Sequence, residues 1–269
     1  MNSNIHSILV VEDNETNQIL IRQQLHYLGY DVDVVNSGEL ALKKLASDKF
    51  DILMTDINMP EMDGYQLTQQ IRTASDIGIS SIPIIAITAN ASGEDEERCL
   101  SAGMDGFMTK PIDLNFLQDY LIKIQQKGKL ATSKNSALVN DNAHISDPER
   151  GEVIHQDSAI LDVSAVSDFV GGNMQMVQKL LTIFLEQTPD IIKQIHTACA
   201  QNDIKNVVNG CHKLKSSARS VGANQLSDLC IEMELAGKDG LLTDVKALDK
   251  QFDVLFNETQ AAIVSLGLD

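Results

Sequence analysis

Polar side chains follow four short apolar runs in the first half of the chain. Each run is too short for a helix, which is typical of a strand buried in a parallel sheet. The polar residues at the carboxyl ends of these runs are Glu12, Asp13, Asp56, Thr88 and Lys110. Because the carboxyl ends of parallel strands meet at one edge of an open α/β sheet, where ligands bind, we expect these side chains to gather there.

Three carboxylates at one edge repel one another unless a cation joins them. Ligands that are all oxygen favour a hard cation, so we expect Mg²⁺ held by Asp13, Asp56 and the backbone carbonyl of Asn58. Thr88 and Lys110 would then bind the remaining oxygens of a phosphoryl group. Phosphoryl transfer to a carboxylate requires this arrangement, and Asp56 is the leading candidate to accept the group.

Strands and helices must alternate for these residues to share one edge. Strand patterns lie at 8–11, 32–35, 52–55, 83–88 and 107–108. A first helical pattern follows the strand at 8–11 and ends at residue 28. Further helical patterns cover 38–46, 65–73, 93–103 and 114–126, and Ser37 and Ser92 are the expected caps of the helices that follow them. Five successive strand–helix pairs predict an α/β doubly wound, five-stranded parallel sheet.

Several separated motifs in this half resemble those of the response-regulator receiver domain. They are VVEDN at 10–14, TDINMPEMDG at 55–64, AITA at 86–89 and TKP at 109–111. The motifs occur in the family's order, and the resemblance covers about residues 5–127. It implies a flavodoxin-like fold.

The resemblance also implies roles for individual residues. They are Asp56 as phosphoacceptor, Glu12 and Asp13 as the acidic pair for Mg²⁺, Thr88 as the switch hydroxyl and Lys110 as the family's lysine. Phe107 stands at the aromatic switch position, which is often Tyr in the family. A Phe can still move in or out there, but it has no hydroxyl to form a hydrogen bond. On the same analogy we expect a cis peptide bond between Lys110 and Pro111.

No strand pattern recurs from residue 163 onward. Helical patterns cover 163–170, 174–188, 189–200, 204–221, 224–236 and 241–266. Short connections between amphipathic helices predict an all-α antiparallel bundle. Residues 128–156 lack apolar periodicity and read as a flexible linker. The predicted division is therefore 1–127, 128–156 and 157–269.

His212 lies on the helix predicted at 204–221, about 130° from the centre of its apolar stripe, so we expect it to face water. Three cations, Lys205, Lys215 and Arg219, lie near it around the helix axis. Neighbouring cations lower the pKa of an imidazole and keep it neutral and nucleophilic. The same cations would hold an incoming phosphoryl group.

The segment HKLKSSA at 212–218 resembles the histidine-phosphotransfer domain, over about residues 157–269. The resemblance implies that His212 is a phosphoacceptor and that Lys215 is its electrostatic partner. The family commonly has Gly where Ser216 stands. Because Ser is nearly as small, we expect docking to be altered but transfer to persist.

Composition limits the other classes of function. The 269 residues carry a formal net charge of −17, neither half is basic and Trp is absent, which argues against a nucleic-acid surface. No apolar run is long enough for a membrane span, so we expect a soluble, cytoplasmic protein. The four cysteines fit no zinc spacing and are expected to be reduced core thiols.

These features favour a two-component phosphorelay protein that carries phosphoryl groups on Asp56 and His212. The sequence contains no glycine-rich ATP motif of a kinase, so we expect a histidine kinase in another chain, or another relay protein, to supply the group, and partner receivers to exchange it. Two alternatives remain: a binding scaffold gated by the receiver, and a Mg²⁺-dependent aspartyl-phosphate phosphohydrolase. The second is disfavoured because Asn58 stands where such an enzyme usually has an acid.

Overall fold

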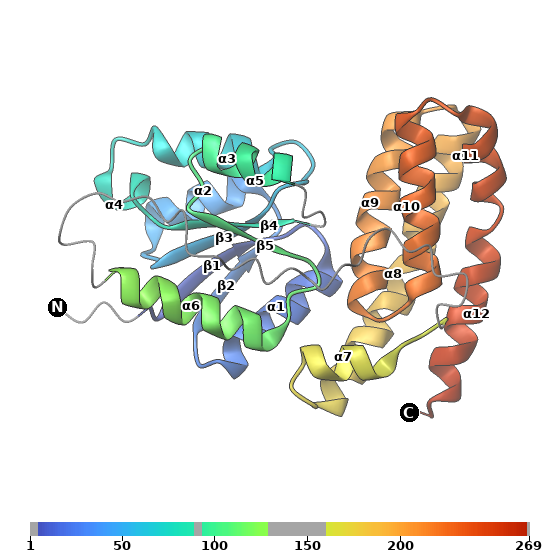
Figure 1. Ribbon diagram of the computed structural model, residues 1–269, viewed down its shortest axis with the longest axis horizontal. Helices are drawn as coiled ribbons and strands as arrows, with labels where there is room; N and C mark the ends of the chain where they lie inside the picture. The colour runs from blue at the N-terminus through green and yellow to red at the C-terminus, as the bar shows by residue number, and fades with distance from the viewer. Residues whose placement is uncertain (1–4, 89–92, 129–159, 268–269) are drawn as a thin grey trace. The chain divides into compact units, whose positions relative to one another are not determined.

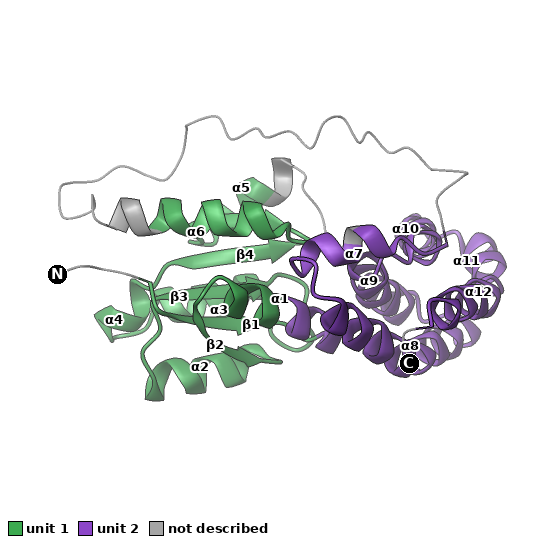
Figure 2. Ribbon diagram, turned by 90° about the horizontal axis from the view of Figure 1, so that it is seen from below, with its two compact units in different colours: residues 1–13, 21–154 green, residues 14–20, 155–269 purple. Residues whose placement is uncertain are grey.

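The computed structural model describes residues 5–88, 93–128 and 160–267. The chain divides into two compact units (Figure 2). Residues 1–13 and 21–154 make up the first unit, and residues 14–20 with 155–269 make up the second. The predicted linker, 128–156, lies outside the described residues except for Gly128, so its flexibility stays a prediction.

A five-stranded parallel sheet in the order β2-β1-β3-β4-β5 is the centre of the first unit (Figure 1). Its strands are β1 (Ser7–Val11), β2 (Asp31–Val35), β3 (Ile52–Asp56), β4 (Ile84–Thr88) and β5 (Gly106–Thr109). All four neighbouring pairs are parallel. Strand β3 is buried along its whole length, as its apolar run predicts. The predicted doubly wound fold is confirmed.

Helices cover both faces of this sheet (Figure 1). They are α1 (Glu15–Tyr27), α2 (Gly38–Ser47), α3 (Gly64–Arg72), α4 (Ile77–Ser80), α5 (Gly93–Ser101) and α6 (Leu114–Gly128). One apolar core joins α1 and α6 to one face through residues such as Leu25 and Leu117. The other joins α2 and α3 to the opposite face through residues such as Leu45 and Leu67. The four-residue helix α4 was not predicted.

Local sequence signals set several helix ends. Ser37 caps α2 by accepting a hydrogen bond from the amide of Leu40, as predicted. Gly29 follows α1 with a φ of +87°, a conformation that glycine adopts without steric cost. Asp63 and Gln66 form a capping box at the start of α3. The predicted cap Ser92 lies outside the described residues.

The second unit is a helical bundle, as predicted. Its helices are α7 (Val163–Phe169), α8 (Met174–Ala200), α9 (Ile204–Ser220), α10 (Asn224–Lys238), α11 (Leu242–Asp249) and α12 (Phe252–Ser265). Asn173 caps α8 and Asp203 caps α9. Gly222 follows α9 with a φ of +72°, directly after the helical pattern predicted at 204–221.

Helix α8 corrects the prediction that Pro189 starts a separate helix. The structure has one continuous helix with Pro189 inside it. Proline removes the amide that would bond to the carbonyl of Leu185, which disfavours a helix interior. The apolar face nevertheless continues across it, with Phe184 before and Ile191 after the proline both buried in the bundle core. Tertiary packing therefore outweighs the local preference of proline for a break.

A second correction concerns the single helix predicted at 241–266. The structure has two helices, α11 and α12, separated by Lys250 and Gln251. The amide of Gln251 bonds to the carbonyl of Leu248, three residues back, so the α-helical ladder tightens and ends there. The sequence has neither Gly nor Pro at this break, and we find no local signal for it.

The structure can be compared with two expectations drawn from composition, one about the cysteines and one about membrane spans. Cys99, Cys199, Cys211 and Cys230 are free and buried, as expected of core thiols. Among the helices of the described ranges, none combines the length and the apolar character needed to cross a membrane.

His196 connects three helices of the bundle at the break between α11 and α12. Its Nδ1 lies 2.7 Å from Asp249 Oδ1 and its Nε2 lies 3.4 Å from Asp253 Oδ1. Burial would lower the pKa of His196, but the hydrogen bonds and charges of Asp249 and Asp253 outweigh it and raise the pKa above its usual value. The ring thus joins α8 to α11 and α12, and it does so most strongly when it is protonated.

The raised pKa of His196 predicts a pH-dependent loss in the variant His196→Gln. A group whose pKa is raised on folding stabilises the native state below its unfolded pKa, and this contribution disappears as pH rises through the folded pKa. His196→Gln should therefore lower the free energy of unfolding more at about pH 5.5 than at about pH 8.5. Urea denaturation at both pH values measures this. Equal losses would contradict it, and His26→Gln, at an exposed position on α1, is the control.

Candidate functional site

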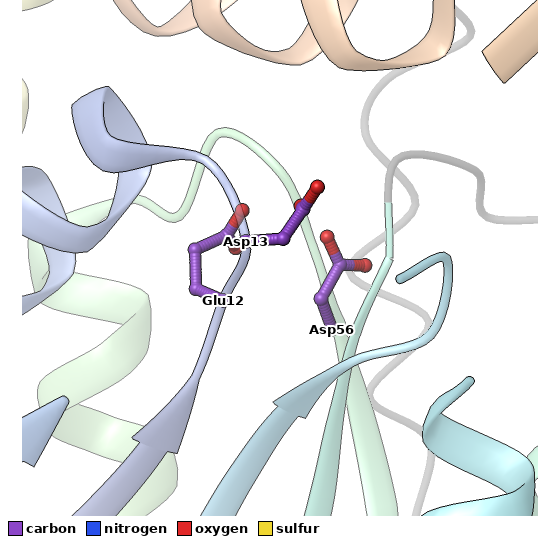
Figure 3. A group of neighbouring side chains, drawn as sticks. All are labelled: Glu12, Asp13 and Asp56. Carbon is purple, nitrogen blue, oxygen red and sulfur yellow. The ribbon is translucent and has the colours of Figure 1, made fainter. Parts of the chain in front are cut away.

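Three carboxylates gather at the carboxyl edge of the sheet (Figure 3). Glu12 and Asp13 directly follow β1, and Asp56 is the last residue of β3. One oxygen of each lies within 4.8 Å of the other two. Glu12 and Asp56 are buried, whereas Asp13 is partly exposed. An all-oxygen donor set of this kind fits a hard divalent cation such as Mg²⁺.

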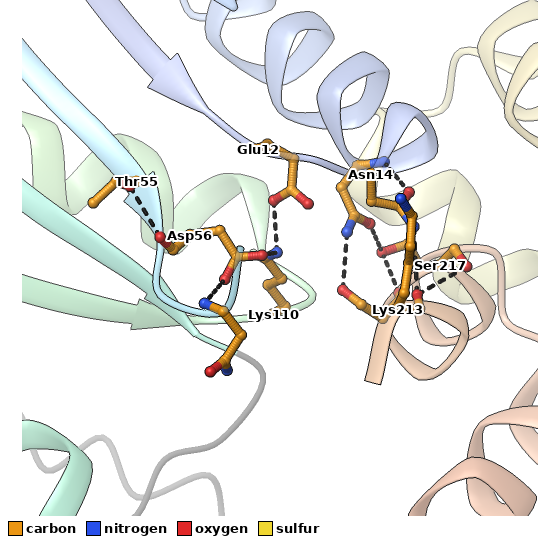
Figure 4. Close-up of polar contacts among 11 residues, drawn as sticks. Glu12, Asn14, Thr55, Asp56, Lys110, Lys213 and Ser217 are labelled. Carbon is orange, nitrogen blue, oxygen red and sulfur yellow. Dashed lines mark hydrogen bonds and ion pairs between the residues drawn. The ribbon is translucent and has the colours of Figure 1, made fainter. Parts of the chain in front are cut away.

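Lys110 lies between two of these carboxylates (Figure 4). Its Nζ is 2.6 Å from Asp56 Oδ2 and 2.6 Å from Glu12 Oε2. Burial would lower the pKa of Lys110, but the charges of Asp56 and Glu12 raise it above its usual value, so the side chain is an ammonium ion. Three carboxylates beside one ammonium have an excess of two formal negative charges, which a divalent cation would match.

Backbone and side-chain contacts hold Asp56 in place. The amide of Asn58 lies 3.2 Å from Asp56 Oδ1 and donates to it, while Oδ2 accepts from Lys110. Thr55 Oγ1 donates to the backbone carbonyl of Asp56 at 2.9 Å (Figure 4). The carboxylate is therefore oriented by one contact on each oxygen. The role of Asn58 as a metal ligand through its carbonyl stays a prediction.

The sheet register gives the positions of Thr88 and Phe107, the two residues to which the resemblance gives switching roles. Asp56 pairs with Ile87, so Thr88 stands one residue farther toward the carboxyl edge on the neighbouring strand. Thr88 is buried, and its carbonyl accepts a hydrogen bond from the amide of Lys110 at 2.7 Å. Phe107 pairs with Ala86 and is partly buried against the apolar core that joins α2 and α3 to the sheet. Their switching roles stay predictions.

The turn after Asp56 is tighter than its sequence indicates. The amide of Gly64 bonds to the carbonyl of Ile57 at 2.9 Å, which brings the start of α3 back against the end of β3. A Cβ at Gly64 would lie 2.5 Å from the carbonyl oxygen of Asp56. The sequence shows Asp63-Gly64 as a turn but cannot show this close approach. Glycine is required here because any side chain would collide with this carbonyl, which belongs to Asp56, the central residue of the site.

A second polar group surrounds His212 on α9. His212 is partly buried, and its Nδ1 lies 3.6 Å from Glu234 Oε1 on α10, which is too long for a hydrogen bond but close enough for electrostatic attraction. Lys215 is 4% exposed, and its Nζ lies 3.0 Å from both oxygens of Glu234. Burial would raise the pKa of Glu234, but His212 and Lys215 lower it below its usual value.

These surroundings differ from the predicted ring of cations. Lys215 turns inward to pair with Glu234, so the facing helix brings a carboxylate close to His212. A helical wheel gives the angle of Lys215 on α9, but it does not show what α10 places opposite. One sequence signal was available. Glu234 follows Cys230 by four residues on the buried stripe of α10, and a buried carboxylate requires a cationic partner.

Two segments of the chain match known protein families. Residues 8–122 match the model of the response regulator receiver domain, and residues 179–261 match that of the Hpt domain. The chain contains a receiver domain followed by an Hpt domain. This is the order that the motifs predict, and it is the domain composition of a two-component phosphorelay protein.

Several known proteins resemble the chain. The sensor protein EvgS of Escherichia coli strain K12 is 30% identical over 229 residues, which are 85% of this chain and 17% of EvgS. The sensor histidine kinase RcsC of Salmonella typhimurium is 44% identical over 114 residues, 42% of this chain and 12% of RcsC. The chain thus spans less than a fifth of the length of these curated relatives. A solved receiver domain, that of sensor histidine kinase PA1611 from Pseudomonas aeruginosa PAO1, is 37% identical and covers 46% of this chain and 99% of its own, with a TM-score of 0.42.

The close approach at Gly64 predicts that Gly64→Ala disturbs the acidic edge of the receiver domain. The added methyl group would meet the backbone of Asp56 and Ile57, which cannot move as a flexible side chain can. We expect a loss of about 1–3 kcal/mol in the free energy of unfolding together with weaker Mg²⁺ binding. Urea denaturation and calorimetric titration with Mg²⁺ measure the two effects. Gly78→Ala is the control, and Mg²⁺ affinity equal to that of the wild type would contradict the prediction.

Proposed function

We propose that the chain carries phosphoryl groups in a two-component phosphorelay, on Asp56 of the receiver domain and on His212 of the Hpt domain. The observation that carries the proposal is the contact of Lys110 with Asp56 at the acidic edge, within a receiver domain that precedes an Hpt domain. The proposed activity is that of a carrier with self-catalysed transfer. An ATP-driven kinase is not part of it.

The receiver residues have distinct roles in the proposed transfer. The Asp56 oxygen forms a bond to phosphorus while the bond to the donor breaks, and the leaving group takes up a proton. Lys110 supplies a cation for a phosphoryl oxygen, and the Thr88 hydroxyl supplies a hydrogen bond to another. Bound at Glu12, Asp13 and Asp56, Mg²⁺ would neutralise charge on the phosphoryl oxygens.

At the Hpt domain, the position of Glu234 supports different roles for the two nitrogens of His212. A carboxylate near Nδ1 favours the tautomer with its proton on that nitrogen. The lone pair of Nε2 is then available to attack phosphorus. Lys215 keeps Glu234 charged, and so acts on His212 through the carboxylate.

Labelling with a small phosphodonor tests the receiver site directly. Wild-type protein incubated with acetyl phosphate and Mg²⁺ should gain one phosphoryl group in its intact mass, and Asp56→Asn should lose that gain. Asp119→Asn, at an exposed position on α6, is the matched control and should label normally. No labelling of the wild type would leave the binding scaffold as the better reading. Steady release of phosphate from phosphate esters would instead favour the phosphohydrolase.

The Hpt site is tested by Glu234→Gln. Loss of the carboxylate leaves the buried Lys215 ammonium unpaired and removes the charge beside Nδ1, so we expect a lower free energy of unfolding and transfer to His212 slowed by about tenfold. Rates of His212 labelling by phosphoramidate, with His212→Gln as the blank, measure the effect. Glu232→Gln on the exposed side of the same helix is the control. Normal labelling of a folded Glu234→Gln protein would reject the assigned role.

The proposal also defines the partners. A histidine kinase would supply phosphoryl groups, and partner receiver domains would exchange them with His212. The similarity to RcsC, which is named a sensor histidine kinase, supports a source of this class. We expect the protein to act in the cytoplasm, which the buried free thiols support, and we expect neither nucleic acid nor membrane as a partner.

A further inference from the structure

The segment from Lys110 to Asp113 carries the lysine of the receiver site, and it is held at several points. The Lys110 amide donates to the carbonyl of Thr88 on β4 at 2.7 Å. The Ile112 side chain is buried in the core shared by α1 and α6. Asp113 caps α6 by accepting from the amide of Phe116 at 2.8 Å. These contacts tie the segment to the sheet and to α6.

A further contact ties the same segment to α1. Gln24 is 1% exposed, and its Nε2 donates to the carbonyl of Ile112 at 2.7 Å. The two residues are 88 positions apart in the chain. Its neighbour Leu25 is also buried and packs in the same core as Ile112. A long polar side chain is rarely buried to this degree unless its hydrogen bond matters to the structure around it.

We propose that Gln24 is a positioning residue for phosphoryl transfer, acting by fixing the backbone two residues after Lys110. This proposal rests on the proposed function, in which the Lys110 ammonium meets a phosphoryl oxygen. The carbonyl of Ile112 is the acceptor, so the amide of Gln24 sets the orientation of the peptide plane between Ile112 and Asp113. The place of Lys110 between Asp56 and Glu12 depends on that backbone.

The proposal separates two properties of the receiver site. The oxygens that would bind Mg²⁺ belong to the ends of β1 and β3, and Gln24 contacts neither strand end through this hydrogen bond. The ammonium comes from the segment after β5. Loss of the Gln24 contact should therefore impair the use of Lys110 in transfer while leaving the affinity for Mg²⁺ intact. A general loosening of the sheet edge would reduce both.

The test is Gln24→Met, which keeps the length of the side chain and removes its donor. At saturating Mg²⁺, labelling of Asp56 by acetyl phosphate should slow by about fivefold or more, because sub-ångström displacement of a catalytic group is costly. The dissociation constant for Mg²⁺ should change by less than about twofold. Gln23→Met, at the next and less buried position of α1, is the control and should match the wild type in both measurements.

A double-mutant cycle with Lys110→Met tests whether Gln24 acts through the lysine. If it does, Gln24→Met should hardly change the residual labelling rate of the Lys110→Met protein, because coupled residues are not additive. Gln24→Asn, which keeps an amide but withdraws it by one methylene, should also slow labelling. This variant serves as the second probe if Gln24→Met does not fold, as judged by circular dichroism.

The outcomes distinguish this inference from the proposed function. Labelling of Gln24→Met at the wild-type rate would overturn the inference. Equal loss of rate and of Mg²⁺ affinity, or full additivity with Lys110→Met, would also overturn it, since Gln24 would then be only a structural residue. Failure of the wild type and of Gln23→Met to label at all would instead overturn the proposed function.

Discussion

The ion pairs of Lys110 with Asp56 and Glu12 are the interaction on which the receiver site depends. They join the carboxyl ends of β1 and β3 to the segment after β5, so three separate parts of the chain meet at one charge. Because these side chains are buried, the ion pairs must form: an unpaired ammonium or carboxylate at such a depth is strongly disfavoured. The same pairs keep an ammonium at the place where a phosphoryl group would arrive. The stability of this edge and the proposed chemistry therefore depend on the same two ion pairs.

The Hpt site also pairs buried charges, but the signs of the central and outer groups are reversed relative to the receiver site. In the receiver domain a lysine lies between two carboxylates, whereas in the Hpt domain the carboxylate of Glu234 lies between Lys215 and His212. A carboxylate acceptor needs a nearby cation to take up incoming negative charge. An imidazole acceptor instead needs its tautomer fixed so that one nitrogen has a free lone pair. Each arrangement suits the nucleophile that the proposed function assigns to it.

Patterns along the chain were sufficient to predict the sheet, the bundle and the gathering of Glu12, Asp13, Asp56 and Lys110. Strand burial and the rule for parallel edges depend on residue type and order, which a sequence contains. Glu234 and the close approach at Gly64 were missed for a common reason. Both depend on what a distant element places opposite, at distances of a few ångströms. Periodicity gives the face of a helix and cannot give its partner. The break between α11 and α12 has no local signal at all.

The proline inside α8 has a consequence for how the Hpt domain is assembled. Helices grow by adding one hydrogen bond for each residue that becomes ordered, and Pro189 leaves that chain of bonds incomplete at its middle. Growth from either end would therefore stall there in an isolated segment. The two halves become one rod only when neighbouring helices cover Phe184 and Ile191 together. The longest helix of the bundle is thus a product of its surroundings, and it would not persist as a free peptide.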